Sequence, residues 1–145
     1  MSEPVISETQ SSPRIGRSVG ALLAGMVTGV APVIATDAAL HATGVFPSSP
    51  QPASDALLLL ATAYRTVYGI AGSYVTAWLA PNHPMRHVLV LGVLGTVLGI
   101  VGVVVTWGRA DVVGHEWYPI ALAALAIPQS WLGGVLHRKW QASTR

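Results

Sequence analysis

Residues 55–80, DALLLLATAYRTVYGIAGSYVTAWLA, form one of four apolar runs in the chain, and this run has an arginine, Arg65, near its middle. The run contains no proline and Pro81 follows it directly, so we expect a helix over its whole length. At about 1.5 Å per residue this helix would be about 39 Å long, more than the roughly 30 Å thickness of a bilayer's hydrocarbon core. The run therefore predicts a transmembrane helix with a cation close to mid-depth.

Arg65 is the residue on which the functional interpretation depends. A guanidinium at the centre of a bilayer costs at least about 2.5 kcal/mol, so it should face the interior of a helix bundle and find a partner there. Gly69 and Gly72 share its helical face, and Tyr64 and Tyr68 form an adjacent pair four residues apart. Two interpretations stay open. Arg65 either extends toward the interface and ties helices together, or it takes part in transport or ligand binding.

The composition favours an integral membrane protein. Only 10% of the 145 residues are charged, whereas soluble chains average roughly 25%. The charges cluster between apolar runs that predict four spans, at residues 17–40, 55–80, 87–107 and 117–136. We expect an all-α fold, a four-helix transmembrane bundle that forms a single domain over residues 15–145. The polar residues 1–14 predict a disordered cytoplasmic tail.

The first span combines small residues with a polar end. Gly25 and Gly29 form a GxxxG pair that allows close helix packing, and Pro32 predicts a kink. Asp37 and His41 are four residues apart on one helical face. Two ligands are too few for a zinc site, so a hydrogen bond near the headgroups is the favoured interpretation of this pair.

These residues suggest one intramembrane polar cluster. Asp37 lies near the outer end of the first span, and Arg65 can reach toward that level. We expect an Asp37–Arg65 ion pair, with His41 and Tyr64 or Tyr68 as hydrogen-bonding neighbours, because pairing offsets the cost of burying both charges.

The third and fourth spans carry packing and bending signals. Four glycines form one stripe on the third span, which predicts a groove against the first or second span: Gly92, Gly95, Gly99 and Gly102. Pro128 is expected to break the fourth helix in mid-membrane. Gln129 and Ser130 follow it, and they either satisfy the carbonyl that Pro128 leaves unpaired or line a hydrated path.

The basic residues predict the orientation. Six of the eight lie before the first span, between the second and third, or after the fourth: Arg14, Arg17, Arg86, Arg138, Lys139 and Arg145. The loops on the opposite side hold only Arg109. By the positive-inside rule, both termini are therefore expected in the cytoplasm.

Motifs for catalysis are missing from the sequence. It has no cysteine, no HExxH, no P-loop and no GxSxG, so we expect no enzyme activity, no cofactor and no metal. No basic patch is interleaved with aromatics, so we expect no nucleic-acid partner. The expected partners are the lipid bilayer and either further copies of the chain or a membrane partner protein. A structural or accessory subunit is the favoured function, and a small oligomeric transporter or channel that uses the cluster around Arg65 is the alternative.

Several segments together resemble a group of small bacterial multi-pass membrane proteins. They are TDAALHATGVFP (36–47), AYRTVYGIAGSYVTAWLAP (63–81), HPMRH (83–87), WYPIAL (117–122) and IPQSWLGG (127–134). The resemblance covers nearly the whole chain after Pro13. It implies a location in the bacterial inner membrane and implies no particular activity.

Overall fold

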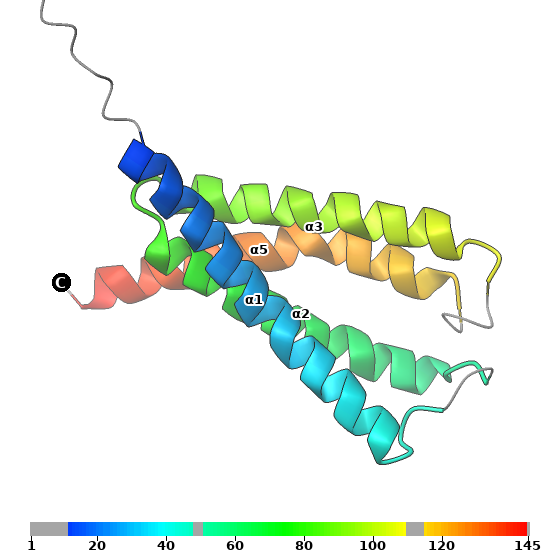
Figure 1. Cartoon of the computed structure of the whole chain (residues 1–145). Helices are drawn as coiled ribbons and strands as arrows, with labels where there is room; N and C mark the ends of the chain where they lie inside the picture. Colours follow the sequence, from blue (N-terminus) through cyan, green and yellow to red (C-terminus); the bar gives the residue numbers. More distant parts are fainter. Residues whose placement is uncertain (1–11, 48–50, 110–114, 145) are drawn as a thin grey trace, which may run out of the picture.

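The computed structural model describes residues 12–47, 51–109 and 115–144. This part of the chain forms four α-helices, shown in Figure 1: α1 (Ser12–Ala42), α2 (Asp55–Leu79), α3 (Pro84–Thr106) and α5 (Trp117–Ser143). The predicted all-α class is confirmed for these residues. The part of the expected tail before residue 12 lies outside the described residues.

Two helices extend five or more residues past one end of their predicted spans. α1 begins at Ser12 and so includes residues 12–14, which the sequence analysis assigned to the tail. α5 continues to Ser143 and includes the basic residues Arg138 and Lys139. A helix satisfies its own backbone hydrogen bonds, so it can extend past the apolar segment into the headgroup region or water.

Local chemistry explains the ends of α2 and the start of α3. Ser54 is the N-cap residue of α2 in an extended conformation, and the N–H of Ala80 bonds to the carbonyl of Thr76 at 3.0 Å where the helix ends. α3 then begins at Pro84, where a proline is tolerated because the first N–H groups of a helix have no partner within it. His83 has a φ of 45°, which turns the chain between the two helices.

The two prolines inside helices do not interrupt them. α1 runs through Pro32 and α5 runs through Pro128, so the expected break at Pro128 is wrong. Within the described part of the chain, neither Gln129 nor Ser130 makes a side-chain hydrogen bond, so the first of their two proposed roles, bonding to the freed carbonyl, is not seen. Packing against neighbouring helices can hold such a helix together despite the lost backbone bond.

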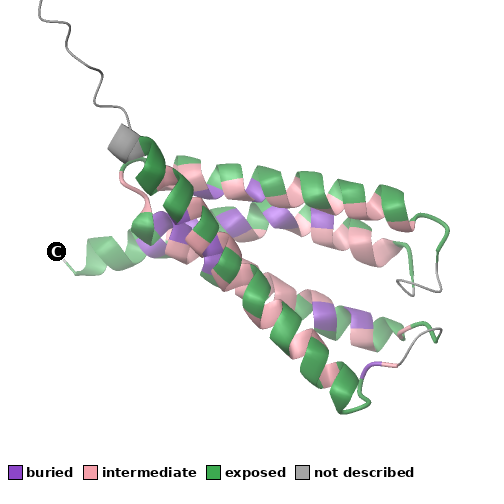
Figure 2. Ribbon diagram, in the orientation of Figure 1, coloured by how far each residue is buried: buried purple, intermediate pink, exposed green. Residues whose placement is uncertain are grey.

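The helices form two pairs that share one end. α1 packs on α2 and α3 packs on α5, while α2 also packs on α5. Figure 1 shows the pairs close together near the α2–α3 connection and separated toward the other end. The start of α1 and the end of α5 lie at the closed end. Figure 2 shows many of the buried positions gathered there.

Close backbone contacts explain why α1 and α2 can cross tightly. A Cβ built on Gly72 would lie 2.4 Å from the carbonyl oxygen of Gly25 and 3.2 Å from the Cα of Gly29. A Cβ built on Gly25 would lie 1.7 Å from Oγ1 of Thr76. Only glycine allows this approach, as the small-residue pattern of the first span indicated.

The glycine stripe on α3 packs on α5, and the expected partner, the first or second span, was wrong. Added Cβ atoms would lie 3.0 Å from Cβ of Ser130 at Gly92, 3.2 Å from Cβ of Ala126 at Gly95 and 2.8 Å from Ala123 at Gly99. Gly102 has open space around it. The stripe alone could not identify its partner because small residues on any neighbouring helix allow the same approach.

Three described helices are long and apolar enough to cross a membrane, namely Ile15–Ala42, Pro84–Thr106 and Trp117–Ser143. The most apolar 18 residues of each have mean hydropathies of 1.9, 2.8 and 1.5, in that order. α2 is not among them, although it is 25 residues long and mostly apolar. The outer faces are also apolar: Val27 is 63% exposed and Val104 is 70% exposed. An apolar surface this extensive is suited to lipid.

Candidate functional site: the Asp37–Arg65 network

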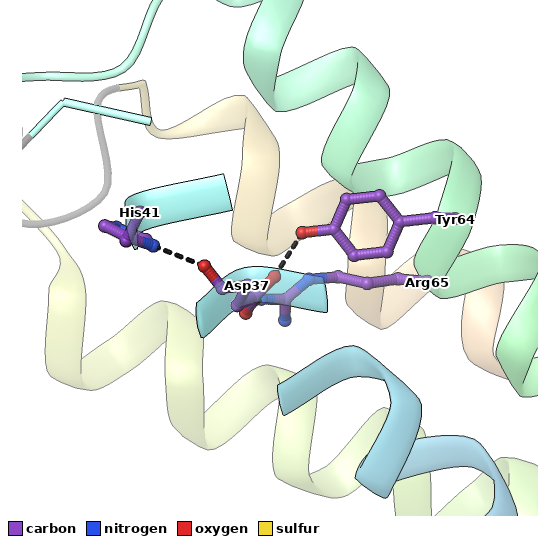
Figure 3. A network of polar contacts seen from close by, with 4 residues as sticks. All are labelled: Asp37, His41, Tyr64 and Arg65. Carbon is purple, nitrogen blue, oxygen red and sulfur yellow. Dashed lines mark hydrogen bonds and ion pairs between the residues drawn. The ribbon is translucent and has the colours of Figure 1, made fainter. Parts of the chain in front are cut away.

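One ion pair joins α1 to α2 where the two helix pairs have separated. Arg65 on α2 donates from Nη2 to Oδ2 of Asp37 on α1. Tyr64 donates from its hydroxyl to the other carboxylate oxygen, Oδ1 (Figure 3). Both oxygens of Asp37 therefore accept charged or phenolic donors from one turn of α2. The structure contains the ion pair that the sequence predicted.

The pair is partly shielded. Without lipid around it, the side chain of Arg65 is 31% exposed and that of Asp37 is 30% exposed. Each group is the counter-charge of the other, because no other ion pair among the described residues involves Asp37 or Arg65. In a bilayer, where an unpaired charge costs about 2.5–3.5 kcal/mol, such pairing is the cheapest way to keep both groups ionised.

A third helix completes the surroundings of the guanidinium. Cζ of Arg65 lies 5.9 Å from the centre of the Tyr118 ring on α5, within the range of a cation–π contact. The Nε atom of Arg65 is buried and has no hydrogen-bond partner among the described residues. This contact could not be predicted from the sequence, because no spacing rule links a residue at the start of α5 to the middle of α2.

The other predicted members of the cluster lie nearby but play smaller parts. Nδ1 of His41 is 2.8 Å from the backbone carbonyl oxygen of Asp37, and its ring stacks on Phe46 at 5.4 Å. His41 therefore bonds to the main chain of Asp37 and not to its carboxylate (Figure 3). Oη of Tyr68 lies 3.1 Å from Oγ1 of Thr36, which adds a second polar link between α1 and α2.

A second polar group, also missed from the sequence, joins the starts of α2 and α5. The Nε1 atom of Trp117 donates to Oδ1 of Asp55 at 2.8 Å, and Nδ1 of His115 lies 3.1 Å from the same oxygen. Asp55 and His115 are mostly exposed, with side chains 62% and 53% accessible. Exposed pairs of this kind contribute little to stability. An acidic residue at the start of α2, Asp55, could have indicated a polar contact there, but its partners on and before α5 could not be predicted from the sequence.

A partly open pocket of about 150 Å³ also lies between all four described helices. Its walls are mainly apolar, and its polar groups come from Ser73, Gln129 and Ser130. Gln129 reaches the α2 backbone, since a Cβ built on Gly69 would lie 2.6 Å from its carboxamide. The pocket therefore places the polar residues after Pro128 in the centre of the bundle.

The arrangement suits structural pairing better than chemistry. Among the described residues there is no group of three or more His, Cys, Asp or Glu side chains that could hold a metal ion. Asp37 has both oxygens engaged, so it has little capacity left to act as a base. No protein-family model, curated protein or solved structure matches this chain.

Proposed function

We propose that this chain is a four-span protein of the bacterial inner membrane that serves as a structural or partner-binding subunit, with both termini in the cytoplasm. The observation that carries the proposal is the internal pairing of Arg65 with Asp37. Arg65 is bound by the carboxylate of Asp37 and contacts the ring of Tyr118, so it can stabilise the packing of α1, α2 and α5 without a bound solute.

The packing of α2 supports its assignment as a membrane span in addition to the three apolar helices. It lies along both α1 and α5, two helices that are apolar enough to cross a membrane. Arg65 is the basic residue within it, and the carboxylate of Asp37 compensates its charge inside the bundle. The basic residues support the orientation, because Arg17, Arg86 and Arg138 belong to the ends of α1, α3 and α5 that meet at the closed end (Figure 1).

The topology is tested with reporter fusions in a bacterial host. An alkaline phosphatase, active only outside the cytoplasm, is fused after residue 47, after residue 109 and at the C-terminus. We expect activity at the first two positions and none at the third. Activity at the C-terminus, or a chain that stays soluble and monodisperse without detergent, would contradict the proposal.

The structural role is tested by capturing partners from membranes. Tagged wild-type protein and the Arg65→Leu variant are purified in mild detergent, with Arg109→Gln as the control for a lost charge at an exposed site. We expect a stoichiometric membrane protein or a second copy to co-purify with wild type and Arg109→Gln, and to be lost from Arg65→Leu. Purification of all three proteins as bare monomers would contradict a subunit role.

The pocket beside Gln129 favours one alternative, a small oligomeric transporter or channel. Gln129 and Ser130 have no side-chain hydrogen bonds among the described residues, and polar groups of this kind can line a hydrated path. The first span lacks the membrane-embedded glutamate of the small multidrug-resistance exporters, so this alternative rests on the pocket alone. Solute flux into proteoliposomes that Gln129→Leu abolishes would favour it over the structural role.

A further inference from the structure

A groove of about 320 Å³ lies between the first turns of α1 and the first turns of α3. Ile15, Val19 and Leu22 line it from α1, and Val90 lines it from α3. Arg86, in the first turn of α3, also borders it. Figure 1 shows both helix starts at the closed end of the bundle.

The groove has a polar end and an apolar length. Ile15, Val19 and Leu22 are spaced by four and three residues, so they form one strip about 10 Å long on α1. Val90 lies one turn further along α3 than Arg86, on the same face. The cation therefore lies at the end of the groove where α3 begins, and the apolar walls continue into the membrane-crossing part of both helices.

Arg86 is suited to bind an anion. The ion pairs in the described part of the chain are Asp37–Arg65 and Asp55–His115, so no described carboxylate pairs with Arg86. Its planar guanidinium can donate two parallel hydrogen bonds to a phosphate. Arg138 and Lys139 at the end of α5 make the same end of the bundle basic, which attracts anionic lipid.

We infer that this groove binds an anionic phospholipid, with the phosphate at Arg86 and an acyl chain along Ile15, Val19, Leu22 and Val90. The inference rests on the proposed membrane location. The apolar walls distinguish a lipid from free phosphate, which would gain nothing from them. Basic pockets between helices on the cytoplasmic side are a known type of lipid headgroup site.

The inference is tested on the full-length protein in mild detergent by native mass spectrometry, with phosphatidylglycerol and phosphatidylcholine titrated separately. We expect wild type to bind phosphatidylglycerol more tightly, and Arg86→Gln to bind it about fivefold more weakly, as expected for about 1 kcal/mol per basic residue. Arg109→Gln, which removes an exposed arginine at the other end of the bundle, should bind like wild type. Equal weakening in both variants, or no lipid preference in wild type, would overturn the inference.

A second variant tests the apolar wall. Val90→Trp should fill the groove and lower phosphatidylglycerol binding at least fivefold while the helical circular-dichroism signal is kept. Unchanged binding by a folded Val90→Trp would place the lipid elsewhere. Inorganic phosphate is the matched probe for the anion alone: if it raises the melting temperature of wild type as much as the lipid does, the site binds anions and the lipid assignment is wrong.

Two other occupants give distinguishable results. If phosphatidylglycerol binds only after residues 1–11 are removed, that segment occupies the groove. If the protein is a dimer that excludes lipid and Val90→Trp makes it monomeric, a second copy occupies it. Either result overturns the inference. If the protein needs detergent but shows no lipid preference, only the lipid-binding inference is wrong. If the protein is soluble without detergent, the proposed membrane function is wrong as well.

Discussion

The guanidinium carbon of Arg65 on α2 lies 5.9 Å from the centre of the Tyr118 ring on α5, so this arginine of α2 contacts both α1 and α5. The carboxylate of Asp37 binds one side of the guanidinium, and the ring provides a second contact. Arg65 thereby links the α1–α2 pair to the first turn of α5.

Replacing the ring tests this link. Tyr118→Leu should destabilise the protein by about 1 kcal/mol, because a partly desolvated cation–π contact is lost. Tyr118→Phe keeps the ring and should unfold like wild type. Thermal unfolding in detergent, followed by circular dichroism, makes the comparison. If both variants lose the same stability, the hydroxyl matters and the ring contact does not.

Asp37→Asn should destabilise the protein by about 2 kcal/mol, because Arg65 is left without its counter-charge. This is less than the 3–5 kcal/mol found when a fully buried pair is broken, because both side chains are about one-third accessible. The double variant Asp37→Asn/Arg65→Gln should be more stable than the sum of the single losses predicts. Unfolding by sodium dodecyl sulfate gives the double-mutant cycle, and simple additivity would mean that the charges do not interact.

Asp55 is more exposed than Asp37, so its replacement should have a smaller effect on stability. Asp55→Asn removes the charge opposite His115 at a site where both side chains are more than half accessible. We expect a change below about 1 kcal/mol, because exposed ion pairs are screened by water. The same unfolding assay applies. A loss as large as that of Asp37→Asn would show that the starts of α2 and α5 are more tightly coupled than their exposure indicates.

Gly72→Ala tests the crossing of α1 and α2. The new Cβ would lie 2.4 Å from a backbone oxygen that cannot rotate away, so the helices must separate. We expect a loss of about 1–3 kcal/mol, as for overpacked cores. Gly102→Ala is the matched control on α3, where the added methyl group meets open space and should be neutral or slightly stabilising. Equal effects of the two substitutions would mean that helix propensity, and not packing, explains the result.

Several features of the structure could be predicted from the sequence, because they depend on the polarity of individual residues and on whether lipid or water surrounds them. Long apolar runs predicted helices, and three of these are apolar enough to cross a membrane. The acyl chains of lipid cannot compensate a charge, so an ion pair between an aspartate and an arginine on adjacent helices is strongly favoured. The Asp37–Arg65 contact followed from that constraint.

Other features depended on which helices are neighbours. Three features belong to this class: the helix on which the glycine stripe around Gly95 packs, the contact of Tyr118 with Arg65, and the groove beside Arg86. The uninterrupted course of α5 through Pro128 also depends on the helices packed around it.

The amino-acid sequence by itself thus determined the all-α class, the apolar helices and the need to pair the charges among them. The tertiary structure decided which surfaces meet. The physical reason is that lipid is as apolar as a leucine side chain, so it drives no particular pairing of helices. Close packing of small residues selects the neighbours, and many segments of this chain carry small residues at a suitable spacing.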